Sequence, residues 1–133
     1  MTSPFVQPSI ERLHVKGTSE WIDVHRELTF GQQQDMLARM RKQFGLGEPP
    51  VLDTTRIGRA RMEAYIVGWS FTDPQGKPVA VTPAALDNLS VHMARDIRDL
   101  LEAHEQKVVD EYEAEKNAPD GASASSPISP SVK

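Results

Sequence analysis

The four histidines are the first residues to test for metal or acid–base chemistry. His92 and Asp96 stand four residues apart, so a helix would place an imidazole and a carboxylate side by side. A solvated polar face explains that pair better than a shared cation does. His104 falls in an apolar stripe and is expected in the core, whereas His14 and His25 are expected to face each other across a hairpin. No His-x-x-x-His pair or zinc-protease pattern occurs, so no metal site is predicted.

Nucleophilic catalysis needs a serine, threonine or cysteine beside a base and an oxyanion hole. The sequence has no cysteine and no Gly-x-Ser-x-Gly elbow. The Gly45-x-Gly47 pair is followed by Glu48 and two prolines instead of a helix, which makes it a poor phosphate cradle. We therefore predict no catalytic residue, no cofactor and no enzymatic activity.

Two tryptophans and a cluster of arginines are the residues best suited to binding a partner. Trp21 and Trp69 each come at the start of an expected strand, where the ring either joins the core or forms an exposed anchor. Core packing is the favoured interpretation for both. Arg56, Arg59 and Arg61 could bind nucleic acid, but no helix-turn-helix, zinc or aromatic-platform pattern accompanies them.

The N-terminal elements that would position Trp21 have the pattern of a hairpin. Residues 1–9 contain two prolines and little periodicity, so they are expected to form a flexible arm. Residues 10–16 and 20–25 are β-like runs that flank Gly17-Thr18-Ser19, which predicts a β-hairpin. Because an isolated hairpin is marginally stable, one of its faces should rest on helices.

The first helix is expected to begin after Thr29. This residue is a good N-cap, and Gln32 completes a capping box. Gly45 should end the helix, and Pro49-Pro50 interrupts the chain beyond it. Helical spacing predicts the apolar positions of this element, which are Phe30, Met36, Leu37, Met40 and Phe44.

The second helix should span residues 54–67, with Asp53 as its cap. The chain should then enter a short strand at Trp69, turn at residues 73–76 and return over residues 78–81. This segment is the second β element of the predicted fold.

Two further helices complete the domain. Thr82 and Pro83 begin a short one, and Ser90 caps a long one that reaches about Asn117. The inner stripe of the long helix is predicted to be Ala94, Ile97, Leu101, His104, Val108 and Tyr112.

The predicted fold class is α+β. Residues 10–117 form a single, mostly helical globular domain with an N-terminal hairpin, a short second β element and a long C-terminal helix. Residues 118–133 are rich in Ser, Pro and Ala and are expected to form a disordered tail.

Charge is unevenly placed along the chain. Six basic residues lie between residues 39 and 61, and seven acidic residues lie between residues 99 and 116. They are expected to be solvated helix faces that complement each other or face water; the alternative is a basic surface and an acidic arm with separate partners. The net charge of −4 argues against nucleic acid as the main partner.

The sequence also indicates the cellular compartment in which the protein is expected. No apolar run is long enough for a membrane span, and the N-terminus lacks the pattern of a secretory signal. The absence of cysteine excludes disulfides and fits a reducing, cytoplasmic setting.

One longer pattern carries a family resemblance. From Arg61 to Leu89 the chain follows Arg-x-x-Ala-Tyr-Ile-Val-x-Trp-Ser-Phe-x-Asp-x-x-Gly-Lys-Pro-Val-x-Val-Thr-x-x-Ala-Leu-x-x-Leu, and the Trp21-Ile-Asp-Val-His-Arg-Glu-Leu-Thr segment fits as well. Over residues 10–104 the chain resembles the tail assembly chaperones of long-tailed bacteriophages.

The resemblance implies a role in assembly, without enzymatic activity, in the host-cell cytoplasm. Its implied partners are the tape-measure protein and the tail tube protein, and many such chaperones are also made in a longer, frameshifted form. It implies no individual contact residue, and self-association stays open. The alternatives are a structural virion protein, such as a minor tail or head–tail connector subunit, and a basic-faced regulator that binds nucleic acid.

Overall fold

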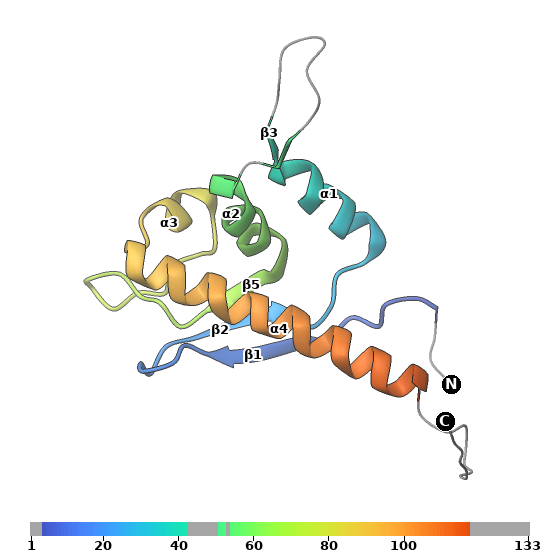
Figure 1. The fold of residues 1–133 in the computed structure, drawn as a ribbon. Helices are drawn as coiled ribbons and strands as arrows, with labels where there is room; N and C mark the ends of the chain where they lie inside the picture. Colours follow the sequence, from blue (N-terminus) through green and yellow to red (C-terminus); the bar gives the residue numbers. More distant parts are fainter. Residues whose placement is uncertain (1–3, 43–50, 53, 118–133) are drawn as a thin grey trace.

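The computed structural model describes residues 4–42, 51–52 and 54–117, which form a three-stranded antiparallel sheet with helices packed on it (Figure 1). The sheet has the order β1-β2-β5 and consists of β1 (Ile10–His14), β2 (Trp21–His25) and β5 (Ile66–Trp69). The fold is α+β, as the sequence predicted. The expected tail over residues 118–133 lies outside the described residues.

The predicted hairpin is confirmed, but its register differs from the expected one. The Val15 amide donates to the Glu20 carbonyl at 2.9 Å, and Gly17 in the turn has a φ of 81°. This turn places His14 opposite Trp21 and Ile10 opposite His25. The expected pairing of the two histidines is therefore wrong, because the turn geometry sets which residues face each other.

Helix α1 (Phe30–Met40) begins with the predicted capping box. The Gln32 amide donates to Thr29 Oγ1 at 3.1 Å, and the Gln32 side chain accepts from the Thr29 amide at 2.9 Å. The helix ends at Met40 and not at Gly45, because β3 (Arg41–Lys42) is extended and pairs with β4 (Val51–Leu52). Phe44 and Gly45 lie outside the described residues.

Helix α2 (Thr54–Tyr65) also ends earlier than expected. Ile66 and Val67, predicted as helix, belong to β5 and the sheet. Both are β-branched, and the backbone of β2 offers partners that outweigh one more helical turn. A bulge lies between the Asp23–Gly68 and Val24–Ile66 pairs, and the expected cap Asp53 is outside the described residues.

The turn and the two later helices begin as predicted. The turn at residues 73–76 is closed by a 2.8 Å bond from the Gly76 amide to the Asp73 carbonyl. Thr82 caps α3 (Pro83–Asp87), and Ser90 Oγ accepts from the Met93 amide at the start of α4 (Val91–Asn117).

Two other expectations were wrong. Residues 78–81 make only an isolated bridge, Thr72 to Pro78, in place of the expected return strand, because the chain turns away toward α3. Tyr112, expected on the inner stripe of the long helix, is 59% exposed, since that helix extends past the core.

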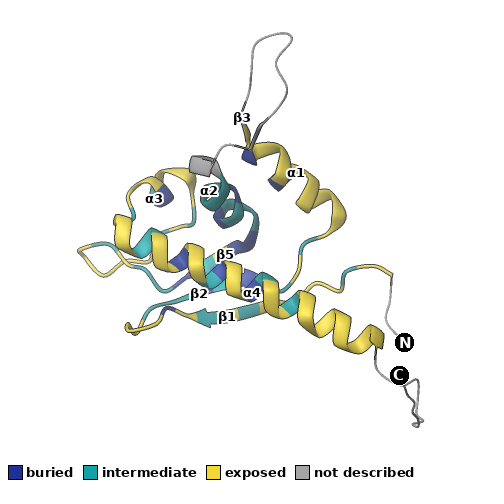
Figure 2. Cartoon of the chain, in the orientation of Figure 1, coloured by how far each residue is buried: buried dark blue, intermediate teal, exposed yellow. Residues whose placement is uncertain are grey.

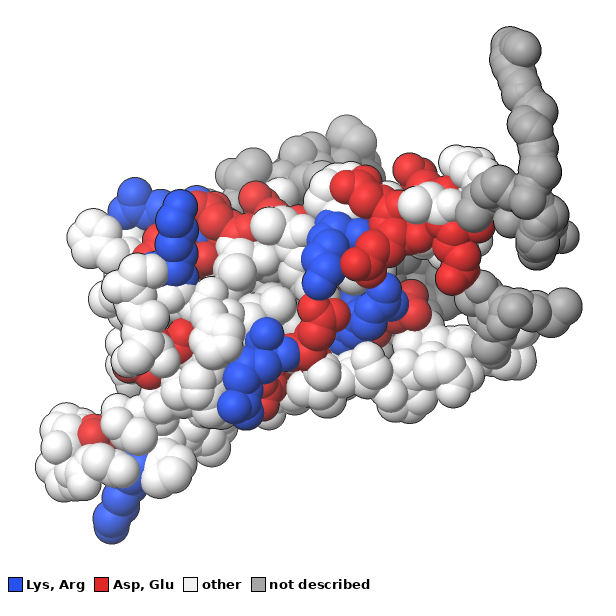
Figure 3. Space-filling view, turned by 90° about the horizontal axis from the view of Figure 1, so that it is seen from below, with Lys and Arg blue, Asp and Glu red and all other residues white. Residues whose placement is uncertain are grey.

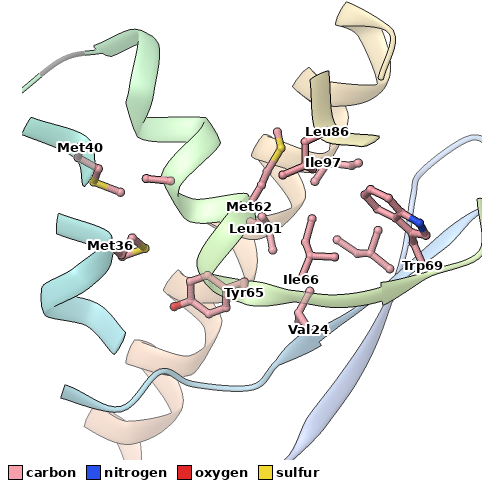
Figure 4. Close-up of a cluster of buried hydrophobic side chains, with 12 residues drawn as sticks. Val24, Met36, Met40, Met62, Tyr65, Ile66, Trp69, Leu86, Ile97 and Leu101 are labelled. Atoms are coloured by element: carbon pink, nitrogen blue, oxygen red, sulfur yellow. The ribbon is translucent and has the colours of Figure 1, made fainter. Parts of the chain in front are cut away.

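The core lies between the inner face of the sheet and the helices (Figures 2 and 4). Ile22 and Val24 of β2 point into it and are fully buried, whereas Trp21, Asp23 and His25 on the opposite face are half-buried. Figure 2 shows the C-terminal part of α4 as exposed, and every residue from 109 to 117 is so classed. The helical core residues are Met36, Met40, Ala60, Met62, Tyr65, Leu86, Ile97 and Leu101.

Candidate functional site

Trp69 is part of the core. Its side chain is 9% exposed, and its indole Nε1 donates to the Val79 carbonyl at 2.7 Å. The ring of Phe71 lies 5.0 Å away, centroid to centroid. Because the ring is buried and its indole NH is hydrogen-bonded within the chain, Trp69 is not a surface anchor.

Trp21 is half-buried on the outer face of the sheet and is covered by an arginine. The Arg12 guanidinium carbon lies 3.5 Å from the ring centroid of Trp21. Arg12 also donates to both carboxylate oxygens of Asp23, at 2.9 and 3.1 Å, and this hydrogen bonding lowers the pKa of Asp23. Arg12 is therefore stacked on the Trp21 ring while it pairs with Asp23, and it covers one face of that ring.

The predicted arginine cluster is engaged within the chain wherever its side chains are described. Arg59 pairs with Glu63 at 3.0 Å and with Asp87, and Arg61 pairs with Glu105 at 2.8 Å. The Arg56 side chain lies outside the described part. The expectation that the basic and acidic segments complement each other is thus confirmed for Arg61, a residue of α2 that binds α4.

Basic and acidic side chains also adjoin one another on the lower side of the molecule (Figure 3). Arg26 lies 3.8 Å from Glu11 and 2.5 Å from Glu111, and Lys107 lies 2.9 Å from Glu11. This mixing of signs is unlike the single-sign stripe of a nucleic-acid interface.

A carboxylate, a phenol and a guanidinium meet between α2 and α4. Glu105 accepts from Arg61 Nε at 2.8 Å and from the Tyr65 hydroxyl at 3.0 Å, and the groove beside them has a volume of about 550 Å³. Burial, followed by the nearby Glu105 charge, raises the pKa of Tyr65 well above its ordinary value. The phenol therefore stays protonated and donates, so this cluster holds two helices together.

Two of the histidines make polar contacts within their own chain. His104 is 3% exposed, as predicted for a core residue, and its Nε2 lies 2.8 Å from the Arg26 carbonyl oxygen. His92 Nδ1 lies 3.1 Å from Arg95. Among the described residues, no group of three or more His, Cys, Asp or Glu side chains could hold a metal ion.

The best candidate for a binding site is an apolar groove beside β5, here called the β5 groove. It has a volume of about 360 Å³. Arg39 and Glu63 form an ion pair of 3.4 Å among its lining residues. Val67, which is 45% exposed, contributes an accessible apolar side chain to this groove. The other lining residues are Ile66, Val81, Thr82, Pro83 and Leu86.

Sequence reasoning missed the β5 groove because it placed Ile66 and Val67 in a helix. The available signal was two β-branched residues directly before Gly68, which is typical of a strand with a bulge. None of the predicted binding residues lines this groove.

No described helix combines the length and the apolar character that crossing a membrane requires. Comparisons of the chain with protein-family models, with curated proteins and with solved structures found no match.

Proposed function

We propose that this protein is a tail assembly chaperone of a long-tailed bacteriophage, which binds the tape-measure protein in the host cytoplasm and assists tail tube assembly. The observation that carries the proposal is the β5 groove, an apolar hollow with a charged residue of each sign in its lining. The resemblance over residues 10–104 supplies the identity of the partner.

The β5 groove fits the apolar stripe of an amphipathic helix. Five of its lining residues are apolar, and the accessible ones, Val67, Val81 and Pro83, are those against which a partner would bury aliphatic side chains. Arg39 and Glu63, which pair with each other at 3.4 Å, form a polar border beside that stripe. A tape-measure protein is a long helical chain with such stripes, and covering them reversibly would keep it in solution.

A role in binding nucleic acid receives no support from the described arginines. Arg59 and Arg61 already pair with carboxylates of their own chain. Binding phosphates would require those ion pairs to break.

Co-expression with the tape-measure protein of the same phage tests the proposal. The wild-type chain should keep that protein soluble and co-purify with it. Val67→Asp should weaken the complex about tenfold or more, since a charge would enter the apolar groove. Phe30→Asp is the matched control, because Phe30 is 77% exposed and does not line the groove.

Two results would overturn this assignment. One is a tape-measure protein that aggregates equally with and without the chain; the other is undiminished binding by Val67→Asp. Mass spectrometry of purified particles separates a chaperone, which should be missing from the virion, from a structural subunit.

A further inference from the structure

One flank of α4 carries a regularly spaced stripe of side chains. Neighbouring members of the stripe are alternately four and three residues apart, which places all of them on one side of a helix. The stripe consists of Val91, Arg95, Arg98, Glu102, Glu105 and Val109.

When the α4 stripe is read in the opposite direction, each arginine position becomes a glutamate position, and the two ends are both valine. Counting outward from residue 100, Arg98 corresponds to Glu102, Arg95 to Glu105, and Val91 to Val109. An antiparallel second copy of the stripe would therefore place each arginine opposite a glutamate and one valine opposite the other. A two-fold axis between the helices, at the level of residue 100, would repeat every such contact.

Three of the four charged members, Arg95, Arg98 and Glu102, have only long or local polar contacts within their own chain. Arg98 lies 3.5 Å from its neighbour Asp99, and Glu102 lies 3.7 Å from Arg61. Arg95 contacts His92. Glu105 differs, because it pairs with Arg61 and accepts a hydrogen bond from Tyr65. About one-quarter of its side chain is still exposed.

The ends of the stripe expose apolar side chains that cannot meet each other in one chain. Val91 is 77% exposed and Val109 is 47% exposed. They are 18 residues apart on α4 (109 minus 91), a distance of about 27 Å at 1.5 Å per residue. An antiparallel second copy would bring each of these valines next to the other valine of its partner.

A hollow beside the N-terminal end of the stripe adds a place for a further side chain. It has a volume of about 580 Å³ between α2, α3 and α4, and Met62, Leu86 and Leu89 line it. By the same reversal about residue 100, Tyr112 of a second copy would lie beyond Val91 toward α3, at this hollow. Tyr112 is 59% exposed in the single chain.

From this stripe we infer that the protein forms a two-fold symmetric dimer through antiparallel pairing of α4 with α4 of a second copy. The charges set the direction and register of the pairing, and the apolar ends and Tyr112 supply buried area. The stripe residues themselves do not line the β5 groove, although Leu86 borders both that groove and the hollow beside the stripe. The inference rests on the α4 stripe and not on the proposed function.

Charge reversal with mixing tests the pairing directly. Sedimentation velocity of the wild-type chain at high concentration should show a dimer that dissociates as ionic strength rises from about 0.05 to about 0.5 M. Arg98→Glu and Glu102→Arg should each be monomeric, because like charges then face each other. An equimolar mixture of the two variants should form a dimer again, since every reversed residue meets an opposite charge.

Val91→Asp provides a variant without reversal of the central charges. Val91 is 77% exposed at the start of α4, where a carboxylate suits the helix dipole, so folding should be retained while dimerisation weakens about tenfold. Circular dichroism checks that each variant is folded. A wild-type monomer at every concentration, a monomeric mixture of the folded variants, or a mass that grows beyond two copies would overturn the inference.

Discussion

At the scale of single residues, Glu105 differs sharply from its acidic neighbours. Its side chain is 26% exposed and accepts two hydrogen bonds, whereas that of Glu102 is 54% exposed and lies 3.7 Å from Arg61. Removing a carboxylate destabilises the fold most where it leaves a partly buried cation without its partner. Arg61, at 15% exposure, is such a cation.

Glu105→Ala is therefore expected to lower the free energy of unfolding by about 2–3 kcal/mol, because it strands Arg61 and the Tyr65 hydroxyl. Glu102→Ala, the matched control one helical turn away, should change it by less than about 0.5 kcal/mol. Urea denaturation of both variants measures the difference. Equal effects would show that the hydrogen bonds of Glu105 contribute no special stability.

Residue roles were predictable from sequence only where the local pattern determines them. His104 lies in an apolar stripe, and its burial was predicted correctly. Glu105 lies in an acidic run and has the pattern of a solvated residue. Its role depends on Arg61, 44 residues away in sequence, and no local pattern reveals that pairing.

At the scale of elements, helix starts were predicted better than helix ends. Thr29, Thr82 and Ser90 cap helices as expected, because an N-cap binds amides only a few residues away. Two ends were wrong, since α1 and α2 each stop where the chain joins a strand partner elsewhere in the sequence. Such pairing is non-local and overrides helix propensity.

The hairpin turn gives a clear test at this scale. Gly17→Ala should destabilise the protein by about 1 kcal/mol, because alanine disfavours the φ of 81° although nothing lies within 4 Å of the new methyl group. Gly31→Ala in α1 meets equally open space at a helical position and should stabilise by about 0.5 kcal/mol. Thermal denaturation measures both. Changes of the same sign would contradict the conformational explanation.

At the scale of the whole molecule, ion pairs join the sheet to the long helix. Lys107 on α4 donates to Glu11 on β1 at 2.9 Å, and this hydrogen bond lowers the pKa of Glu11 below its ordinary value of 4.5. A carboxyl whose pKa is lower in the folded state stabilises the fold above its unfolded pKa. That contribution is lost as the pH falls through the folded pKa.

Acid should therefore remove the advantage of the wild-type chain over Glu11→Gln. The difference in unfolding free energy between them should be constant near about pH 7 and shrink below about pH 4. Lys107→Gln, which removes the partner, should show the same convergence with the wild type. Urea titrations across this pH range measure it, and a gap that stays constant down to about pH 3 would refute the assignment.

The position of α4 in the chain has a consequence for biosynthesis. The strands of the sheet are complete once Trp69 has been made, yet Ile97 and Leu101, which are fully buried in the core, come later. Leu101 follows Trp69 by 32 residues (101 minus 69), which takes about 2–6 seconds at ribosomal speeds of about 5–20 residues per second. During this interval α4 cannot cover Ile22 and Val24, because its core residues have not yet been made. A protein proposed to cover the apolar surface of another protein thus itself has an apolar sheet face that stays uncovered by α4 for a short time during its synthesis.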